Sequence, residues 1–260
     1  MRRFRSLLPH FCVLYLFVGL LNNFESLGAE KITILADIWC PYNCEPKTSS
    51  PGYMVEILMK TLQKPEWKMY ELDYHVMPWA RALVEGREGR IQGIIGAGSG
   101  DREGFEFTVP LGRDSNCFYA QKNSRWKFHK ISDLDRLERI GTMLDYVYPD
   151  ALQTWLNNHK AKLHPVSGNE PLLGNAQKLE MGRIDAFIEN KNVVAYFLSK
   201  HPQFKNIGLA GCSLGDELYI GISKKFHHYR QLTKSINQTV SQMKASGEYS
   251  KLLKKYSLKE

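Results

Sequence analysis

Two aromatic side chains and one glycine-rich loop stand where an α/β protein could hold a small molecule. Trp39 and Tyr42 follow the first predicted strand, and ligand groups in α/β sheets gather at the carboxyl ends of strands. The loop Gly96–Gly100 offers backbone N–H groups and the Ser99 hydroxyl, which could cradle an anion. Packing in the core for the aromatic pair, and a plain turn for the loop, remain open as alternatives.

The patterns of common catalytic sites are missing from the sequence. Gly96–Gly100 is neither a complete G-x-G-x-x-G nor a nucleophile elbow, and no Lys-Ser/Thr pair follows it. Glu189 could be a general acid, but a binding contact or a surface carboxylate explains it as well. No metal spacing and no Ser/His or Cys/His arrangement involves the histidines after residue 29, which are His75, His129, His159, His164, His201, His227 and His228. We therefore expect a binding protein with no cofactor and no metal.

The number of cysteines is even after the N-terminal segment, which in an oxidising compartment predicts disulfides. Four of the five lie after residue 29: Cys40, Cys44, Cys117 and Cys212. An even set in an exported protein is typical of two disulfides, although the pairing cannot be deduced from sequence alone. Buried free thiols are the alternative, and the single C-x-x-x-C pair lacks the second ligand pair of a zinc site.

Residues 1–29 have the three-part layout of a secretory signal peptide. Three arginines precede an apolar run over Phe11–Leu21, and small residues end the segment at Gly28 and Ala29. The run is only about half of the roughly 20 residues that cross a bilayer, so a membrane anchor is the weaker interpretation. We expect cleavage near Ala29 and a soluble periplasmic protein.

The charge of the chain argues against nucleic acid as a partner. Removing residues 1–29 takes away three of the 35 Lys and Arg and one of the 27 Asp and Glu, which leaves a net charge of about +6. Short blocks such as Lys224-Lys225 are scattered, whereas nucleic-acid binders concentrate positive charge on one face. The remaining length, about 230 residues, suffices for one large domain or two small ones.

After residue 29 the chain alternates predicted strands and helices. Strand patterns cover Lys31–Ala36, about Leu72–Met77, Ile91–Gly96, Asn116–Gln121 and Glu217–Ile222. Helix patterns cover Tyr53 to about Leu62, the segment after Pro78, about Val193–Leu198, and an apolar stripe from Tyr229 to Met243 that Gly247 ends. The alternation predicts an α/β fold with largely parallel sheets.

One internal echo suggests two similar lobes. Gly89–Gly96 and Gly182–Glu189 both read as a Gly-Arg-Ile turn after a helix, followed by a buried strand. Two related α/β lobes would explain the echo, and chance similarity of a short segment is the alternative.

Several short motifs, in their order and spacing, are together specific for a fold. They are Ala36–Tyr42, Pro51–Glu56, Met77–Arg81, the two Gly-Arg-Ile strands, Phe107–Pro110, and Ala245–Tyr249 with Leu252, Leu253 and Tyr256. With these motifs the chain resembles the periplasmic solute-binding proteins that serve ABC importers of amino acids and related polar compounds, the bacterial extracellular solute-binding protein family 3. The resemblance covers nearly the whole chain after residue 29.

The resemblance implies the type II periplasmic-binding-protein fold. Two α/β lobes, each with a mostly parallel sheet flanked by helices, would be joined by two hinge strands and would enclose the ligand when they close. The implied bounds are residues 30–117 and 213–260 for lobe 1 and residues 118–212 for lobe 2. Cys117 would then meet Cys212 at the crossings, and Cys40 would pair with Cys44 in the first ligand loop.

The resemblance also implies ligand-binding residues in lobe 1. Trp79 lies where similar proteins place an aromatic ring against the ligand. Arg102 precedes a Phe-Thr-x-Pro run, as does the arginine that clamps a ligand carboxylate in similar proteins. The loop before Arg102 is shorter than usual, and Arg81 is the alternative cation.

In lobe 2 the resemblance points to a helix N-terminus and to one strand end. The segment Gly141–Tyr146 leads toward a helix of the kind that receives a ligand carboxylate, although Asp145 places a negative charge there. Asn190 stands where similar proteins carry an aspartate that holds the ligand ammonium, which predicts weak binding of ordinary α-amino acids. Its neighbour Glu189 is expected to face the other side of the strand. The full predicted ligand set is Trp39, Tyr42, Trp79, Arg81, Ser99, Arg102, Asp145, Tyr146 and Asn190.

The function implied by the resemblance is capture of a small polar solute in the periplasm by a monomer, followed by delivery to an ABC permease. A sensory ligand-binding receptor is an alternative, since the same module can present its closed form to a receptor. A small-molecule lyase on the same fold is a weaker one.

Overall fold

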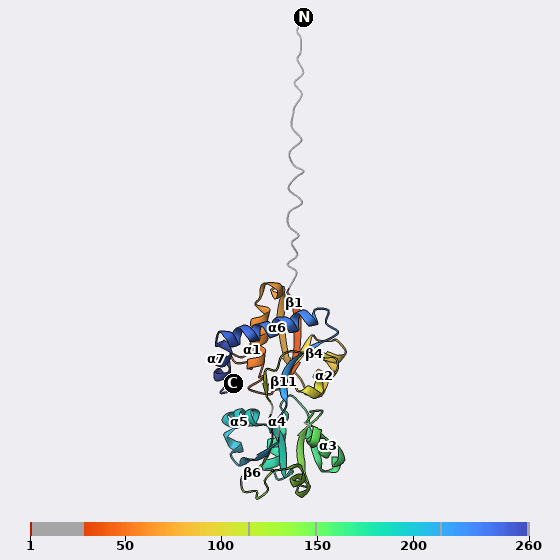
Figure 1. Ribbon diagram of the computed structural model, residues 1–260, viewed down its shortest axis with the longest axis vertical. Coiled ribbons are helices and arrows are strands. Elements are labelled where there is room, and N and C mark those ends of the chain that lie inside the picture. Colours follow the sequence, from red (N-terminus) through yellow and green to blue (C-terminus); the bar gives the residue numbers. More distant parts are fainter. Residues whose placement is uncertain (2–28, 114, 149, 214, 259–260) are drawn as a thin grey trace.

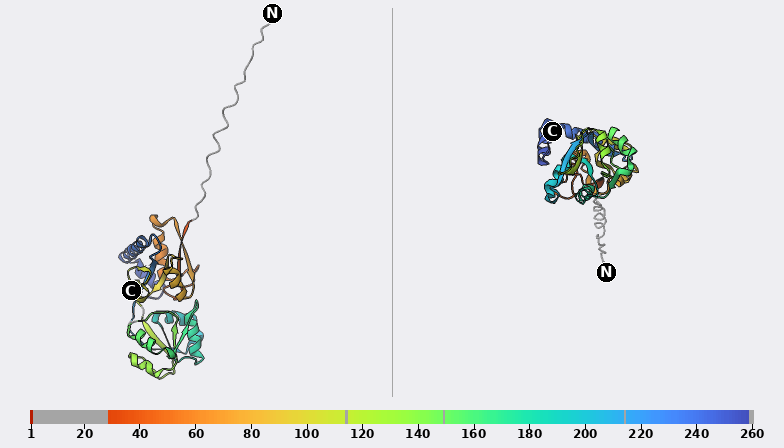
Figure 2. Two further views of the ribbon diagram at one scale, coloured as in Figure 1. Left: turned by 90° about the vertical axis from the view of Figure 1, so that its right-hand side faces the viewer. Right: turned by 90° about the horizontal axis from the view of Figure 1, so that it is seen from below.

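A computed structural model describes Met1 and residues 29–258, apart from residues 114, 149 and 214. The described part forms two α/β lobes stacked one above the other, each built around one mixed sheet (Figure 1, Figure 2). Most of the expected signal peptide lies outside the described residues. Within the described part of the chain, no helix combines the length and the apolar character needed to cross a membrane.

The first sheet has the strand order β2-β1-β3-β11-β4, with β5 paired to β11. Its strands are β1 (Glu30–Ala36), β2 (Tyr70–Val76), β3 (Gly93–Ala97), β4 (Phe105–Phe107), β5 (Gly112–Arg113) and β11 (Glu217–Ser223). β1 runs parallel to β2 and β3, whereas β11 is antiparallel to β3, β4 and β5. The expectation of a largely parallel sheet therefore needs correction, because β11 returns from the other lobe and runs in the opposite direction.

Helices cover both faces of the first sheet. They are α1 (Tyr53–Leu62), α2 (Trp79–Arg87), α6 (Tyr229–Ala245) and α7 (Glu248–Lys255), with short 3-10 turns η1 (Pro65–Trp67) and η2 (Ser99–Asp101). Side chains alternate along β1, so Ile32 and Ile34 join the core under α1 and α6, whereas Leu35 joins the core under α2. Gly247 has a φ of 73°, a left-handed conformation that ends α6 as expected.

The second sheet has the strand order β10-β6-β9-β7-β8. Its strands are β6 (Asn116–Gln121), β7 (Ile140–Met143), β8 (Leu163–Val166), β9 (Ala186–Asn190) and β10 (Ile207–Cys212). The helices around it are α3 (Asp150–Asn158), α4 (Pro171–Glu180) and α5 (Lys191–Lys200), with 3-10 segments η3 (Ile131–Arg136), η4 (Lys160–Lys162) and η5 (Pro202–Phe204). β7 is parallel to β8 and β9, and β6 is antiparallel to β9 and β10, so this sheet is mixed as well.

The two sheets are built on the same plan, which accounts for the echo in the sequence. The order β8-β7-β9-β6-β10 matches β2-β1-β3-β11-β4 strand for strand, with the antiparallel crossing strand in fourth place in both. Gly89 and Gly182 occupy the same place in the two lobes: each follows a helix, has a positive φ of 77° or 64°, and precedes the central strand.

Two segments join the lobes, one from β5 to β6 and one from β10 to β11 (Figure 1). Cys117 and Cys212 are partners in the β6–β10 register and form a disulfide with their Cα atoms 3.9 Å apart. Cys40 and Cys44 form the second disulfide. Both implied pairings are thus confirmed. The lobe bounds at residues 117/118 and 212/213 stay a prediction, and Asn116 already pairs with the second sheet.

Candidate functional site

A narrow cavity of about 40 Å³ lies between the lobes, where strands of both sheets end. Lobe 1 supplies the segments after β1 and β3, the start of α2 and the start of β11, and lobe 2 supplies the segment after β7. The lining residues are Asp37, Trp39, Trp79, Gly96, Gly98, Asp101, Tyr146, Val147, Asp216 and Leu218. A cavity of this volume has room for only a few water molecules. A larger solute therefore needs the lobes to be farther apart than they are in this structure.

Three aromatic rings wall this interlobe cavity. Trp79 begins α2 directly after Pro78, whose φ of −54° suits the entry into a helix. Its ring meets Tyr146 of lobe 2 edge to face, with the centroids 6.5 Å apart. Trp39 lies after β1 and stacks on Tyr42 with a centroid distance of 4.7 Å. The aromatic wall is thus shared between the lobes and depends on their closure.

The loop that follows β1 and contains Cys40 and Cys44, the first ligand loop, is held in shape by its own contacts. The Cys40–Cys44 disulfide closes it, and the Trp39 N–H donates to the carbonyl of Asn43 at 2.8 Å. The Asn43 side-chain amide donates to the carbonyl of Asp37 at 2.7 Å. These contacts fix the positions of Asp37 and Trp39 relative to β1.

Hydrogen bonds cross directly from one lobe to the other around the cavity. The Tyr146 hydroxyl donates to Asp37 Oδ2 at 2.6 Å, and Trp39 Nε1 donates to Glu189 Oε1 at 2.8 Å. Further crossing bonds join the Ile38 N–H to the Asn169 carbonyl at 3.0 Å, the Tyr42 hydroxyl to Asn190 Oδ1 at 3.3 Å, and Asn192 Nδ2 to the Tyr42 hydroxyl at 3.0 Å. The lobes are therefore in contact through polar side chains and one backbone pair, which would become hydrated when the lobes part.

The cavity is lined by carboxylates. Asp37 and Asp101 are only 3% and 4% exposed, and Asp216 is half-buried at the other edge of the cavity. Burial raises the pKa of Asp37 to about 6, although the hydrogen bond from Tyr146 opposes the rise. Burial likewise raises the pKa of Asp101 to about 6, against the N–H bond from Gly98. Among the described residues, no group of three or more His, Cys, Asp or Glu side chains could hold a metal ion.

We expect Asp101→Asn to stabilise the protein at pH 7.5. The pKa of Asp101 in the folded protein is about 6, above the ordinary aspartate value of 3.8. The stability that protonated Asp101 contributes is therefore fully present below pH 3.8 and is lost as the pH rises through 6. A rise of this size corresponds to up to about 3 kcal/mol. Urea unfolding at pH 4 and 7.5 should show the variant's advantage at the higher pH only. The exposed Glu103→Gln variant is the control, and an advantage that is equal at both pH values would contradict the burial argument.

Five of the nine predicted ligand residues lie at the cavity or beside it. Trp39, Trp79 and Tyr146 line the cavity. Tyr42 and Asn190 contact each other across the lobes beside the cavity, and Asn190 Oδ1 also caps α5 by accepting from the N–H groups of Asn192 and Val193. Their roles in binding stay predictions.

The remaining predicted residues do not line the cavity. The Arg102 guanidinium lies over the Phe107 ring, 4.7 Å from its centroid, and Arg81 is 71% exposed beside Glu85. Ser99 is exposed and hydrogen bonds to Asp216, and Asp145 is exposed. The predicted ligand cation, Arg102 or Arg81, therefore stays a prediction without a place in the cavity wall.

Sequence reasoning missed the carboxylates of the site. Asp37 directly follows the last residue of β1, and this position after a strand was the one signal that could have identified it. Asp101 and Asp216 each follow a glycine, which is no signal for a binding site. Glu189 was expected to face away, yet it contacts Trp39 of lobe 1. The reason is that β9 ends at Asn190, whose side chain turns into the cap of α5 and leaves Glu189 directed at the other lobe.

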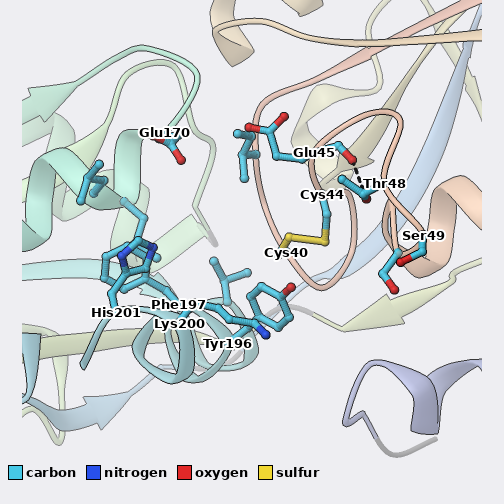
Figure 3. Close-up of a pocket in the computed structure, with 15 residues that line it drawn as sticks. Cys40, Cys44, Glu45, Thr48, Ser49, Glu170, Tyr196, Phe197, Lys200 and His201 are labelled. Carbon is cyan, nitrogen blue, oxygen red and sulfur yellow. Dashed lines mark hydrogen bonds between the residues drawn. A yellow bond between two sulfur atoms is a disulfide. The ribbon is translucent and has the colours of Figure 1, made fainter. Parts of the chain in front are cut away.

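A second, larger cavity of about 310 Å³ lies beside the first ligand loop. Figure 3 shows the Cys40–Cys44 disulfide on one side, and Tyr196 and Phe197 of α5 with His201 just after that helix on the other. Its wall comes from both lobes, from the loop of residues 38–50 and from the helices α4 and α5. The contact between the lobes thus also shapes a mainly apolar pocket outside the strand ends.

Comparison with known proteins relates this fold to a known family. Residues 32–259 match the family model of bacterial extracellular solute-binding proteins, family 3. A curated relative, the probable histidine-binding protein of Campylobacter jejuni, is 21% identical over 242 residues, which cover 91% of this chain and 90% of the relative.

Solved structures show the same fold. The arginine-, lysine-, histidine-binding protein ArtJ of Geobacillus stearothermophilus is similar with a TM-score of 0.69, at 15% identity, over 87% of this chain and 95% of ArtJ. A histidine kinase sensor domain with similarity to periplasmic binding proteins reaches a TM-score of 0.73, at 14% identity, over 90% of this chain and 99% of the domain. The family match spans nearly every described element of both lobes. The chain therefore belongs to the bacterial extracellular solute-binding proteins, family 3, a family of binding proteins rather than enzymes.

Proposed function

We propose that this protein captures a small polar solute between its lobes in the periplasm and delivers it to an ABC importer. The observation that carries the proposal is the interlobe cavity, whose walls come from strand ends of both lobes while only two segments connect them. Such a geometry lets the lobes part to admit a solute and close over it. The signal-peptide layout of residues 1–29 and the two disulfides support export to the periplasm.

A sensory receptor is the second candidate, favoured by the likeness to the histidine kinase sensor domain. Both functions begin with the same binding step and differ in the partner of the closed form. Measuring uptake of the solute in cells that lack this protein distinguishes the two functions. Loss of uptake supports delivery to an importer, whereas intact uptake with a lost transcriptional response supports a receptor.

We expect Trp79→Ala to weaken solute binding at least several-fold. The Trp79 ring lines the cavity and meets Tyr146 across the lobes, and an aromatic contact of this kind contributes about 1 kcal/mol or more. The solute is first identified by thermal shift, where a ligand at 100 times its dissociation constant adds about 2.7 kcal/mol of stability. Calorimetry then gives the affinity of each variant.

Trp67→Ala is the matched control for this variant. Trp67 is a buried tryptophan of the same lobe, 4% exposed against 6% for Trp79, but it does not line the interlobe cavity. Both substitutions remove a large core ring and lower stability, and only Trp79→Ala should change the affinity. Equal affinities in the two variants would show that Trp79 serves the core alone and that the solute binds elsewhere.

A further inference from the structure

The charges on the wall of the interlobe cavity all have one sign. Asp37, Asp101 and Asp216 line it, and its lining contains no lysine, arginine or histidine from the described residues. Glu189 adds a fourth carboxylate, 4% exposed, which reaches the same wall through Trp39. A solute that enters this cavity thus meets carboxylates of lobe 1 directly, while Glu189 of lobe 2 lies behind Trp39.

Asp101 lines this cavity and has one carboxylate oxygen without a hydrogen-bond donor. The residue is 4% exposed, and its Oδ2 atom accepts from the Gly98 N–H at 3.0 Å. Its Oδ1 atom is buried and has no hydrogen-bond partner among the residues that the structure describes. A buried carboxylate oxygen without a donor is costly, typically by about 1–3 kcal/mol, so a donor on the solute would relieve this cost. A cationic donor would relieve it most, because charge-assisted hydrogen bonds are roughly twice as strong as neutral ones.

The other walls suit the body of an organic cation. Trp39, Trp79 and Tyr146 present aromatic rings to the cavity, and such rings attract ammonium and guanidinium groups through their faces. The same rings cover apolar carbon atoms between charged groups. Aromatic walls together with carboxylates therefore favour an alkylammonium or guanidinium group over a bare inorganic cation.

A solute carboxylate finds no counterpart in this wall. Arg81 pairs with Glu85 at the surface, and Arg102 stacks on Phe107 and Tyr219 outside the lining. A carboxylate placed in the cavity would approach Asp37 and Asp101 without a cation to offset the repulsion.

From this cavity we propose that the solute is an organic amine or guanidine that carries no carboxylate, with its cationic group bound between Asp37 and Asp101. This inference rests on the proposed capture function and narrows it to one chemical class. It departs from the amino acids named for the histidine-binding relative and for ArtJ.

The decisive experiment compares amines with the amino acids that differ from them only by the α-carboxylate. Calorimetry at pH 7.5 on the purified protein measures cadaverine against lysine, agmatine against arginine, and histamine against histidine. We expect at least one amine to bind, and to bind at least 10-fold more tightly than its amino acid. An amino acid that binds more tightly than its amine overturns the inference but leaves the capture function standing.

A failure of every amine also overturns the inference. A sugar and dicarboxylate panel then decides the capture function separately, because binding by any of these solutes sustains it and binding by none removes its support. The outcomes for the inference and for the proposed function are therefore distinguishable.

Asp101→Asn tests the residue that carries the argument. The amide keeps the shape of the side chain and can still accept from the Gly98 N–H, but it loses the charge. We expect amine affinity to fall at least 10-fold. The control Glu103→Gln removes a carboxylate two residues away that is exposed and outside the cavity, and it should leave the affinity unchanged. Thermal melts confirm that both variants fold, and equal affinities in wild type and Asp101→Asn would refute the role of this carboxylate.

Discussion

Replacing both Cys117 and Cys212 by alanine is expected to lower the free energy of unfolding by about 4 to 5 kcal/mol. The disulfide spans 95 residues of sequence, and closing so long a loop removes much conformational entropy from the unfolded chain. The matched variant replaces Cys40 and Cys44, which are four residues apart, and should lose only about 2 kcal/mol. The ratio between the two losses tests whether loop length sets the contribution of each bond.

Denaturant unfolding of the two double variants and the wild type measures both losses. Intact-mass analysis before and after reduction of the wild type should show a gain of four hydrogens, two for each of the bonds. Equal losses in the two variants would show that local geometry, rather than loop closure, determines the contribution. A wild-type protein with free thiols would remove the basis of the comparison altogether.

Gly52→Ala is expected to destabilise lobe 1 by about 3 kcal/mol or more, from backbone strain and overpacking together. Gly52 precedes α1 with φ 109° and ψ 143°, a conformation that side chains rarely adopt. A Cβ atom there would lie 2.4 Å from the Tyr42 carbonyl oxygen and 2.6 Å from the Asn43 Cα. Backbone atoms cannot rotate away, so the first ligand loop must shift. Because this loop positions Trp39, solute affinity should fall together with stability.

Gly182→Ala provides the control for this substitution. Gly182 also has a positive φ, 64°, but a Cβ atom there would meet nothing within 4 Å. Only the left-handed strain remains, which amounts to about 1 to 2 kcal/mol. Unfolding free energies and solute affinities of the two variants separate the clash from the strain. A loss for Gly52→Ala no larger than for Gly182→Ala would mean that the loop of residues 39–43 yields without cost.

Local patterns were sufficient to predict most of the fold. The predicted helix from Tyr53 to about Leu62 and the strand Asn116–Gln121 coincide with α1 and β6. The helix has apolar residues at helical spacing, and the strand is a short run of mostly apolar residues because both of its faces are buried. The sheets were harder, because strand direction depends on which lobe a strand enters from. β11 has the same buried pattern in either direction, so its antiparallel pairing was not visible in the sequence.

The site was less predictable than the fold, because its residues come together only in the folded chain. Trp39 was predicted from its position after a strand and Trp79 from the family resemblance, and both line the cavity. The carboxylates were overlooked because an isolated aspartate after a strand carries no periodic signal. Their significance arises from convergence: Asp37, Asp101 and Asp216 are far apart in the sequence and meet only in the folded chain. The place of the two arginines likewise became visible only in the folded chain, where Arg102 lies over Phe107 and Arg81 lies beside Glu85.

The place of β11 in the first sheet sets an order of events during folding. β11 lies between β3 and β4, yet it is the last strand to emerge from a ribosome or a translocation channel. Until then β4 has no neighbour, and α6 and α7 are missing from the core. Lobe 2 is one contiguous stretch that ends with β10, so all its strands are available earlier. During vectorial synthesis the second lobe can therefore fold before the first, whose sheet is complete only when β11 pairs with β3 and β4.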